Sequence, residues 1–552
     1  MIRVISATDK NSLKEKDVEF YLRQDNWNDH SYQTQYHLFL SGAYSLDGEP
    51  VLIGDVKILK KGQTSSDRHL LTIGEIDTLN DDFCSLGQSL DYYERLANIE
   101  PEIRNYIFKA LNDVVINPSI KNSFKKEDGW NISVMRYIDE NDDIFILPPI
   151  MISKDYQKLP SIDLSFKFNN KSLNNPIEFN FDSPSYGYGH KLPSRLIVLV
   201  GRNGSGKSTL LSKISRVAFA SGVDRRDPTL KEIGEFEPAG LGFPKIINIS
   251  YSAFDSFQVP GIYIDEKEQI LKDIKNSQGR YIFCGIRDIC KELESSINSI
   301  ERDSRGKLTK DEILKDRQSF TQLKSIEDLL FEVKTLLEKI KGTDREKILY
   351  KVFNILSKES SFKDLSQLIN KNELVSSLCD IFSNSSTGHK FVIHSLVNII
   401  AHSEKRSLIL FDEPETHLHP PLLAVLMSSI RFVLDELDAF SIIATHSPVV
   451  VQETLSRHVN IIRRKGELTK IITPEIQTYG ENIASITSHV FSLSSEVTDF
   501  HNELDEILSA NKFGFFAGGK SDLLEKCEDL FDGEMSMQAT AYIMSMLAKR
   551  DS

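Results

Sequence analysis

The sequence of 552 residues has few cysteines, no long apolar run and no secretory leader. The five cysteines are Cys84, Cys284, Cys290, Cys379 and Cys527. None forms a C-x-x-C pair, which favours reduced thiols that act as small buried hydrophobes over disulfides or a zinc site. No uncharged apolar stretch approaches the ~20 residues that a membrane helix needs, and the N-terminus lacks the apolar core of a signal peptide. We therefore expect a soluble, cytoplasmic protein without a membrane partner.

The chain also lacks an excess of basic residues, because 66 Lys and Arg face 80 Asp and Glu, for a formal net charge of −14. This balance argues against a protein that coats nucleic acid by itself. No tandem repeat or low-complexity tract is evident. Hydrophobic residues make up 40% of the chain, which is enough for a sizeable core, and the length allows two to four domains at about 150 residues each.

What the sequence does contain is a glycine-rich loop between an apolar run and a helix-like segment, LIVLVGRNGSGKSTLL from Leu196 to Leu211. Its spacing is G-x-x-x-x-G-K-S. Phosphate oxygens approach backbone N–H groups closely only where side chains are small, and the N-terminus of the following helix adds partial positive charge. The predicted ATP-binding residues are Gly201, Arg202, Asn203, Gly204, Ser205, Gly206, Lys207, Ser208 and Thr209.

The polar residues after the apolar runs have distinct expected roles. Lys207 reaches the β and γ phosphates, and the Ser208 hydroxyl is a ligand of Mg²⁺, which prefers hard oxygen donors. A second apolar run, Leu408 to Phe411, ends in Asp412 and Glu413, where an α/β sheet binds its ligands. We expect Asp412 to hold Mg²⁺ opposite Ser208, and Glu413 to orient or deprotonate the attacking water.

A third apolar run, Phe440 to Ala444, is followed by His446. A histidine at the end of a strand that follows the carboxylate strand is expected to hydrogen-bond the γ-phosphate or the attacking water. Glu413 and His446 are therefore the predicted catalytic residues.

Together these motifs resemble the ABC-type ATPases, in the soluble branch that includes SMC-like and OLD-like proteins rather than transporters. The resemblance implies an α/β fold with a mixed sheet core, antiparallel N-terminal strands, a helical insertion and a helical C-terminal region. It also implies a signature loop, for which FSNSSTGHK offers Ser386, Thr387 and Gly388, with Ser385 and His389 where leucine and glutamine are common. In such ATPases the signature loop of one subunit covers the nucleotide of another, so we expect a homo-oligomer, at least a dimer.

The same family places a D-loop after the catalytic glutamate and a lid after an earlier strand. The segment ETHLHPP contains His417 and His419, for which we favour interface packing over metal binding because no further metal-ligand cluster lies nearby. The segment KIINISYSAFDSFQVP leaves three lid candidates open: Ser252, Asp255 and Gln258.

The motifs divide the chain into five regions: a family-specific N-terminal region (1–155), the first part of the ATPase core with the P-loop (156–262), a helical insertion (263–383), the second part of the core (384–475) and a helical C-terminal region (476–552). The segments IDLSFKF and PIEFNFD alternate apolar and polar residues, which predicts antiparallel strands. Within the insertion an a/d stripe favours a helical hairpin core over a partner zipper. The stripe comprises Leu323, Ile326, Leu330, Val333, Leu337 and Ile340.

Segments outside the nucleotide motifs, such as FYLRQDNWNDHSYQTQYHLFL and TYGENIASITSHVFSL, resemble the PtuA-type ATPases of Septu and retron-linked Septu anti-phage systems. This resemblance implies a cytoplasmic defence ATPase that binds a small HNH nuclease, PtuB. In the retron version it implies a reverse transcriptase with its RNA-linked DNA as a further partner. Composition and spacing by themselves indicate none of these partners.

The chain is not expected to carry a nuclease domain of its own. About 100 residues follow His446, too few for the Toprim domain of OLD-like relatives, and the acidic residues of 499–535 are typical of solvated helix faces. We interpret the protein as an ATPase that regulates a separate nuclease. Two other hypotheses stay open: an SMC-like repair ATPase that clamps duplex DNA, and an ATP-gated scaffold that does not hydrolyse ATP.

Overall fold

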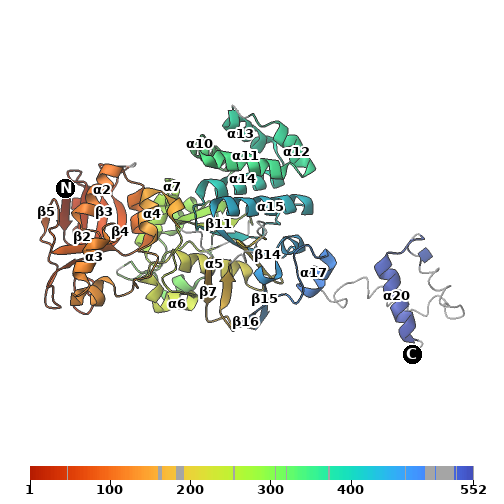
Figure 1. Ribbon diagram of the computed structural model, residues 1–552, viewed down its shortest axis with the longest axis horizontal. Helices are drawn as coiled ribbons and strands as arrows, with labels where there is room; N and C mark the ends of the chain where they lie inside the picture. The colour runs from red at the N-terminus through yellow and green to blue at the C-terminus, as the bar shows by residue number, and fades with distance from the viewer. Residues whose placement is uncertain are drawn as a thin grey trace. The chain divides into compact units, whose positions relative to one another are not determined.

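The computed structural model describes the whole chain except residues 46–47, 160–163, 182–191, 253–254, 256, 305, 319, 371–372, 467, 492–503, 505–527, 530, 532 and 551–552. The chain divides into two compact units, Met1–Ile483 and Ala484–Ser552 (Figure 1). The strands of the described residues all lie in the first unit. The nucleotide motifs lie there too.

A seven-stranded sheet forms the nucleotide core, in the order β12-β11-β13-β14-β9-β15-β16. Neighbouring strands are parallel except at the β15–β16 edge. The three apolar runs predicted from the sequence are β9, β13 and β14, and all their residues are buried, as parallel strands covered on both faces require. The strands are β9 (Leu196–Val200), β11 (Ile246–Ser250), β12 (Tyr281–Gly285), β13 (Leu408–Asp412), β14 (Phe440–Thr445), β15 (Val459–Lys465) and β16 (Leu468–Ile472).

Helices cover both faces of this sheet. Helix α5 (Lys207–Phe219) packs on β11, β13 and β14, whereas α14 (Thr387–His402) packs on β11 and β12. Figure 1 draws α5 on one side of these strands and α14 with α15 (Pro420–Leu437) on the other. The expected α/β P-loop fold is therefore confirmed.

A small antiparallel sheet, β10-β7-β8, lies next to the core. Its strands β7 (Ser165–Asn169) and β8 (Ile177–Asn180) are the two predicted from alternating residues, and β10 (Glu235–Glu237) adds a third. The apolar residues of the pattern turn inward to the core while the polar ones face solvent. The outer ends of the predicted segments, at 162–163 and 182, lie outside the described residues.

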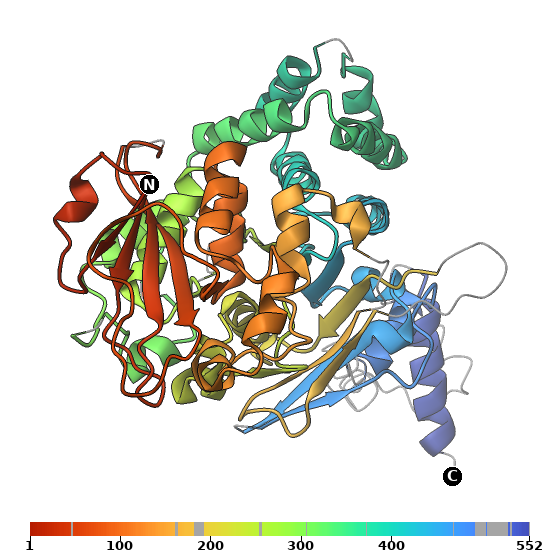
Figure 2. The ribbon, with the colours of Figure 1, turned by 60° about the vertical axis from the view of Figure 1, so that its left-hand side comes forward.

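The N-terminal region builds a second sheet in the order β5-β1-β2-β3-β4-β6, covered by short helices (Figure 2). Its hydrophobic core runs from Ile2 to Leu159 and is separate from that of the nucleotide sheet. The elements are β1 (Ile2–Ile5), β2 (Phe20–Gln24), β3 (Gln35–Leu40), β4 (Val51–Lys60), β5 (Gly74–Ile76), β6 (Phe83–Gly87), α1 (Leu90–Ala97), α2 (Pro101–Ala110), α3 (Pro118–Phe124) and α4 (Leu147–Ser153).

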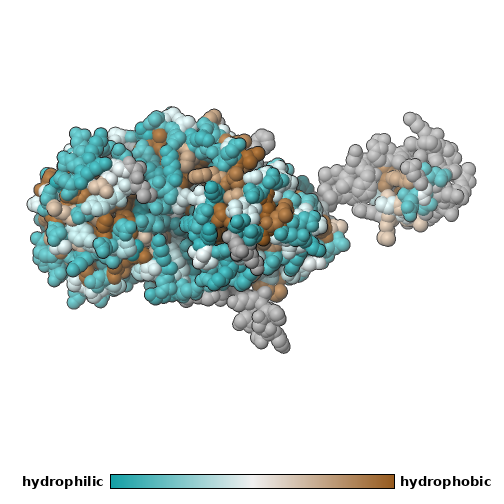
Figure 3. Space-filling model, turned by 90° about the horizontal axis from the view of Figure 1, so that it is seen from above, coloured by the Kyte–Doolittle hydropathy of each residue, from teal (hydrophilic) through white to brown (hydrophobic). Residues whose placement is uncertain are grey.

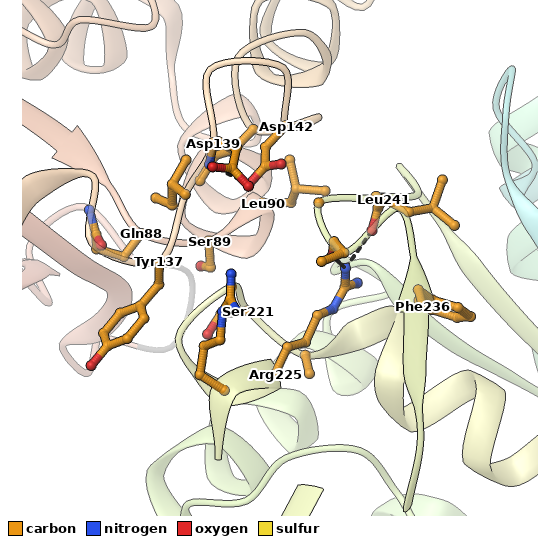
Figure 4. Close-up of a pocket in the computed structure, with 18 of the residues that line it drawn as sticks. Gln88, Ser89, Leu90, Tyr137, Asp139, Asp142, Ser221, Arg225, Phe236 and Leu241 are labelled. Atoms are coloured by element: carbon orange, nitrogen blue, oxygen red, sulfur yellow. Dashed lines mark hydrogen bonds between the residues drawn. The ribbon is translucent and has the colours of Figure 1, made fainter. Parts of the chain in front are cut away.

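Buried ion pairs join the N-terminal region to the nucleotide core. The Arg406 guanidinium donates to both carboxylate oxygens of Asp143, at 2.9 and 2.6 Å. A cavity of about 290 Å³ lies along the same junction (Figure 4). In its wall Arg225 donates to the carbonyl of Leu241 and to that of Val217, near the C-terminal end of α5. Arg280 donates both to Asp91 of the N-terminal region and to the carbonyl of Ala218 in α5, so the helix that begins at the P-loop ends close to the N-terminal region.

The segment 263–383 is mainly helical, but it is not only an insertion. Strand β12 lies within it and pairs in parallel with β11 at the edge of the core sheet. This part of the predicted boundary is wrong because YIFCG is a run of five buried residues, and a five-residue strand is easily overlooked in a polar surrounding. The helices are α7 (Ile264–Lys275), α8 (Ile289–Ser296), α9 (Lys310–Leu314), α10 (Ile326–Ile340), α11 (Asp344–Leu356), α12 (Ser360–Gln367) and α13 (Leu374–Asn384).

The predicted a/d stripe is buried only in its second half. Val333, Leu337 and Ile340 are buried in α10, which packs on α13 and α14. Leu323, which precedes the helix, is 52% exposed and Ile326 is 61% exposed. Figure 3 views the molecule from the side on which Figure 1 draws α10–α13, and hydrophobic patches interrupt its hydrophilic surface.

The described cysteines are free thiols, as expected. Only Cys84 and Cys284 are buried, whereas Cys290 and Cys379 lie at partly exposed sites on helices, which corrects the prediction that each is a buried hydrophobe. Cys527 and most of 499–535 lie outside the described residues. Among the described helices, none is long and apolar enough to cross a membrane. The remaining helices are α6 (Pro228–Ile233), α16 (Pro448–Gln452), α17 (Ile483–His489) and α20 (Met537–Arg550).

Candidate active site

The glycine-rich loop leaves β9 and enters α5 as predicted. Gly204 and Gly206 have φ of 77° and 95°, a conformation that side chains with a β-carbon rarely adopt. Gly201 is required for another reason, because a β-carbon there would meet the Ile462 carbonyl at 2.6 Å. The buried hydroxyl of Ser205 has no hydrogen-bond partner among the described residues. The loop therefore presents backbone and one unused donor to a ligand.

Lys207 carries a buried positive charge inside this loop. Its side chain is 5% exposed and its Nζ donates to the carbonyls of Gly201 and Arg202, at 3.0 and 3.5 Å. No described carboxylate forms an ion pair with it, and burial lowers the pKa of Lys207 although acidic residues nearby oppose the shift. A buried ammonium without an anionic partner is costly, so this residue fits a site for phosphate.

Asp412 stands at the end of β13 and meets the first turn of α5. The Ser208 Oγ donates to Asp412 Oδ1 at 2.9 Å. Asp412 is 6% exposed, and burial, with Asp255 and Glu413 nearby, raises its pKa to about 8 despite the hydrogen bond from Ser208. A buried carboxylate and a hydroxyl side by side are hard oxygen donors that fit Mg²⁺. The structure thus brings the two predicted metal ligands together.

Glu413 and His446 face each other across the ends of β13 and β14. The His446 Nδ1 lies 3.6 Å from Glu413 Oε1. The backbone of Glu413 is left-handed, with φ of 49°, and its N–H donates to the Ala444 carbonyl at 2.8 Å. The closeness of the two side chains lowers the pKa of Glu413 and raises that of His446. Both side chains are partly exposed, as groups that act on a bound ligand must be.

Glu415 is a member of this site that the sequence analysis did not single out. Its two carboxylate oxygens accept hydrogen bonds from Thr445 Oγ1 at 2.8 Å and from the backbone N–H of His446 at 2.7 Å. Its Oε1 also lies 3.2 Å from His446 Nδ1. Glu415 therefore fixes both the backbone and the ring of His446. The sequence offered one signal for Glu415: it is an acidic residue two positions after Glu413, in the loop that follows the apolar run.

The three lid candidates lie beyond the end of β11. Gln258 donates to the Arg317 carbonyl at 2.8 Å, so its amide is engaged with the segment before α10. Asp255 is 3.5 Å from the buried guanidinium of Arg287, and it is close enough to Asp412 to raise the pKa of that residue. Ser252 lies two residues after Ser250, the strand residue that pairs in register with Asp412. Asp255 is thus the candidate whose charge acts on Asp412, the predicted Mg²⁺ ligand.

The predicted signature residues form the N-terminus of α14. The Ser386 side chain caps the helix by accepting from the His389 N–H at 3.4 Å, and Thr387 is exposed. Gly388 is buried, and a β-carbon there would meet the His417 carbonyl of the predicted D-loop at 3.0 Å. The signature and D-loop segments therefore touch within one chain.

His389 is held at both ring nitrogens. Nδ1 lies 2.7 Å from Ser386 Oγ and Nε2 lies 2.8 Å from Ser361 Oγ in α12. His419 caps α15 by accepting from the Leu422 N–H at 3.4 Å. These contacts give both histidines structural roles at the ends of helices.

The strand order and this site define an α/β fold with a P-loop of the kind that binds nucleotides. Residues 196–452, from β9 to α16, match the family described as an AAA domain, putative AbiEii toxin, Type IV TA system. The chain is also 27% identical over 584 aligned positions to the protein ea59 of Escherichia phage lambda, covering 99% of this chain and 97% of that protein. The resemblance to Septu ATPases stays a prediction.

Solved structures similar to this chain include an Smc head bound to the winged-helix domain of ScpA, with 13% identity, 57% of this chain and 97% of that chain covered, and a TM-score of 0.26. An ATP-binding cassette of an ABC transporter, in its ADP conformation, has 14% identity, coverage of 59% of this chain and 95% of that chain, and a TM-score of 0.26. TM-scores this low do not define the fold. The strand order of the seven-stranded sheet, the glycine-rich loop and the strand end with Asp412 and Glu413 define it.

Replacing Lys207 by Ala should weaken ATP binding by about 30-fold or more, because truncating one partner of a buried charge pair costs about 2–5 kcal/mol. Lys213→Ala is the matched control, since Lys213 lies on the same helix but pairs with Asp316. Binding of a fluorescent ATP analogue measures both. Native affinity in the Lys207 variant would exclude the P-loop as the phosphate site.

Proposed function

We propose that this chain hydrolyses ATP at an interface between two copies of itself, and that its nucleotide state regulates an associated nuclease. The observation that carries the first part is the buried Lys207 ammonium without a carboxylate partner, beside the Ser208–Asp412 pair and the Glu413–His446 pair. One anion-binding group, one metal-binding pair and one acid–base pair meet at neighbouring strand ends. This is the set of parts that phosphoryl transfer to water needs.

Each residue has a chemical task in this site. The loop N–H groups and Lys207 hold the phosphates, and Ser208 with Asp412 would hold Mg²⁺. When bound, that ion neutralises phosphate charge. Glu413 stays ionised at neutral pH, because its pKa is lowered by His446, so it can accept a proton from water. His446, held by Glu415, can donate a hydrogen bond to the phosphate that is released.

The dimeric arrangement is supported by the exposed N-terminus of α14. Ser386 and Thr387 are exposed at the start of a 16-residue helix, whose first N–H groups and dipole attract anions. These residues can contact a nucleotide held by another copy. ATP bound at such an interface stabilises the dimer, and its hydrolysis weakens it.

Glu413→Gln should lower ATP turnover by about 10²–10⁴-fold, the usual contribution of a general base, while ATP binding persists and ATP-dependent dimers become longer-lived. Phosphate release and sedimentation velocity with ATP measure the two effects. Unchanged phosphate release would remove Glu413 from the mechanism. A wild-type protein that dimerises with ATP but releases no phosphate would be an ATP-gated scaffold instead.

The regulatory role is supported by the comparisons and by the absence of a predicted nuclease motif in the sequence. The family description names a toxin of a toxin–antitoxin system, and the similar full-length protein comes from a phage. Both descriptions fit a role in the conflict between phages and their hosts. Together with the resemblance to Septu ATPases, they favour an anti-phage system in which an HNH-type nuclease is the effector. A retron reverse transcriptase with RNA-linked DNA is a further candidate partner.

Co-purification of the tagged protein, expressed with its neighbouring genes and with or without ATP, tests this role. We expect a small nuclease to co-purify, alone or with a reverse transcriptase and its DNA, and its retention to depend on ATP. The Lys207→Ala variant is the control for nucleotide dependence. Recovery of duplex DNA alone, lost at high salt, would contradict the proposal and indicate a DNA-clamping repair ATPase.

A further inference from the structure

A polar network of Tyr251, His394 and Glu332, buried at its inner end, connects the nucleotide edge of the sheet to the helical subdomain. Tyr251 directly follows Ser250, the strand residue that pairs in register with Asp412. The hydroxyl oxygen of Tyr251 lies 2.5 Å from Nδ1 of His394 in α14. The other ring nitrogen of His394 lies 3.0 Å from Glu332 Oε2 in α10. Three elements far apart in the sequence thus meet through one continuous set of hydrogen bonds.

Aromatic packing joins the same elements beside the polar network. Phe391, one turn before His394 in α14, contacts the Tyr251 ring edge-on at 4.3 Å between centroids. Phe391 also lies 6.1 Å from the ring of Phe411, the residue before Asp412. The aromatic contacts therefore pack α14 against the ends of both β11 and β13.

Lys324 anchors the Glu332 end of the polar network. Its Nζ lies 2.6 Å from Glu332 Oε1, and its backbone N–H donates to the Ile286 carbonyl, just beyond β12, at 2.7 Å. The Glu332 carboxylate therefore bridges His394 and a lysine fixed near the sheet edge. Tilting α14 against the sheet would break at least one of these bonds.

The Glu332 carboxylate faces both Lys324 and His394. Burial disfavours a charged His394, but Cys284 and Glu332 outweigh it and raise the pKa of His394 to about 9. The two ring nitrogens of His394 are thus engaged by different elements, Nε2 by Glu332 of α10 and Nδ1 by the Tyr251 hydroxyl. Deleting the Tyr251 oxygen removes the nearest polar partner of Nδ1 and leaves Cys284 Sγ at 3.5 Å.

We propose that Tyr251, His394 and Glu332 are positioning residues that couple the phosphate site to α14 and set where its Ser386–Gly388 end lies relative to the nucleotide. The polar network starts one residue after the register partner of Asp412 and ends on the helical subdomain. A shift at the strand ends therefore reaches the signature end of α14 through bonded groups. This inference depends on the proposed ATPase function, because the signature residues matter only if a nucleotide is bound.

Tyr251→Phe in the full-length protein tests the inference, since it keeps the ring that packs on Phe391 and removes only the hydroxyl. Tyr281→Phe is the matched control: Tyr281 is also a buried tyrosine of this sheet, but its hydroxyl lies near Asn248 and its ring near Phe219 of α5. The readouts are ATP affinity, ATP turnover, and hydrogen exchange of residues 387–402 with and without ATP. Glu332→Gln gives a second probe, at the other end of the polar network.

We expect Tyr251→Phe and Glu332→Gln to keep ATP affinity within about twofold while turnover falls about fivefold or more, the lower range of measured couplings between sites. ATP should protect α14 from hydrogen exchange in the wild type and in Tyr281→Phe. The protection should be much weaker in Tyr251→Phe and Glu332→Gln. If Tyr251→Phe and Tyr281→Phe showed equal protection of α14 and equal turnover, the inference would be wrong but the proposed function would stand. Failure of the wild type to bind ATP would instead overturn the proposed function.

Discussion

The hydrogen bond of 2.9 Å from Ser208 to Asp412 joins two segments that are 204 residues apart, and the rest of the site depends on it. It holds the first turn of α5 against the end of β13, so that the loop with Lys207 and the loop with Glu413 face one ligand. Parallel strands make this meeting possible, because their carboxyl ends lie at one edge of the sheet. The buried charge of Lys207 and the buried carboxylate of Asp412 then require a ligand that carries both an anion and a cation.

Around this pair the structure places groups that a single motif does not define. Glu415 orients His446, and His446 in turn lowers the pKa of Glu413. On the opposite face of the sheet, α14 presents its N-terminus to the solvent while its middle is held by buried hydrogen bonds. A protein built in this way can convert the presence of a phosphate into the position of a helix end. That is what regulation of an assembly by ATP requires.

The sequence predicted the nucleotide strands and their terminal residues, because a short buried run that ends in a glycine-rich loop, a carboxylate or a histidine is typical of the ligand edge of a parallel sheet. It did not predict β12, which is equally short but ends in no such group, or the exposure of Leu323 and Ile326. Periodicity reports which residues lie on one face of a helix but not what covers that face. Glu415 and the Tyr251–His394 contact were also missed, since both join segments through folding and not through spacing.

The most direct test of the central claim, that one copy completes the site of another, is ATP turnover in a mixture of two inactive variants. Lys207→Ala disables the phosphate loop and leaves the signature intact, whereas Thr387→Arg blocks the exposed signature and leaves the loop intact. We predict that each variant alone is inactive and that mixing them restores turnover, because a mixed dimer contains one complete site. A mixture as inactive as its components would contradict the account and place the whole site within a single chain.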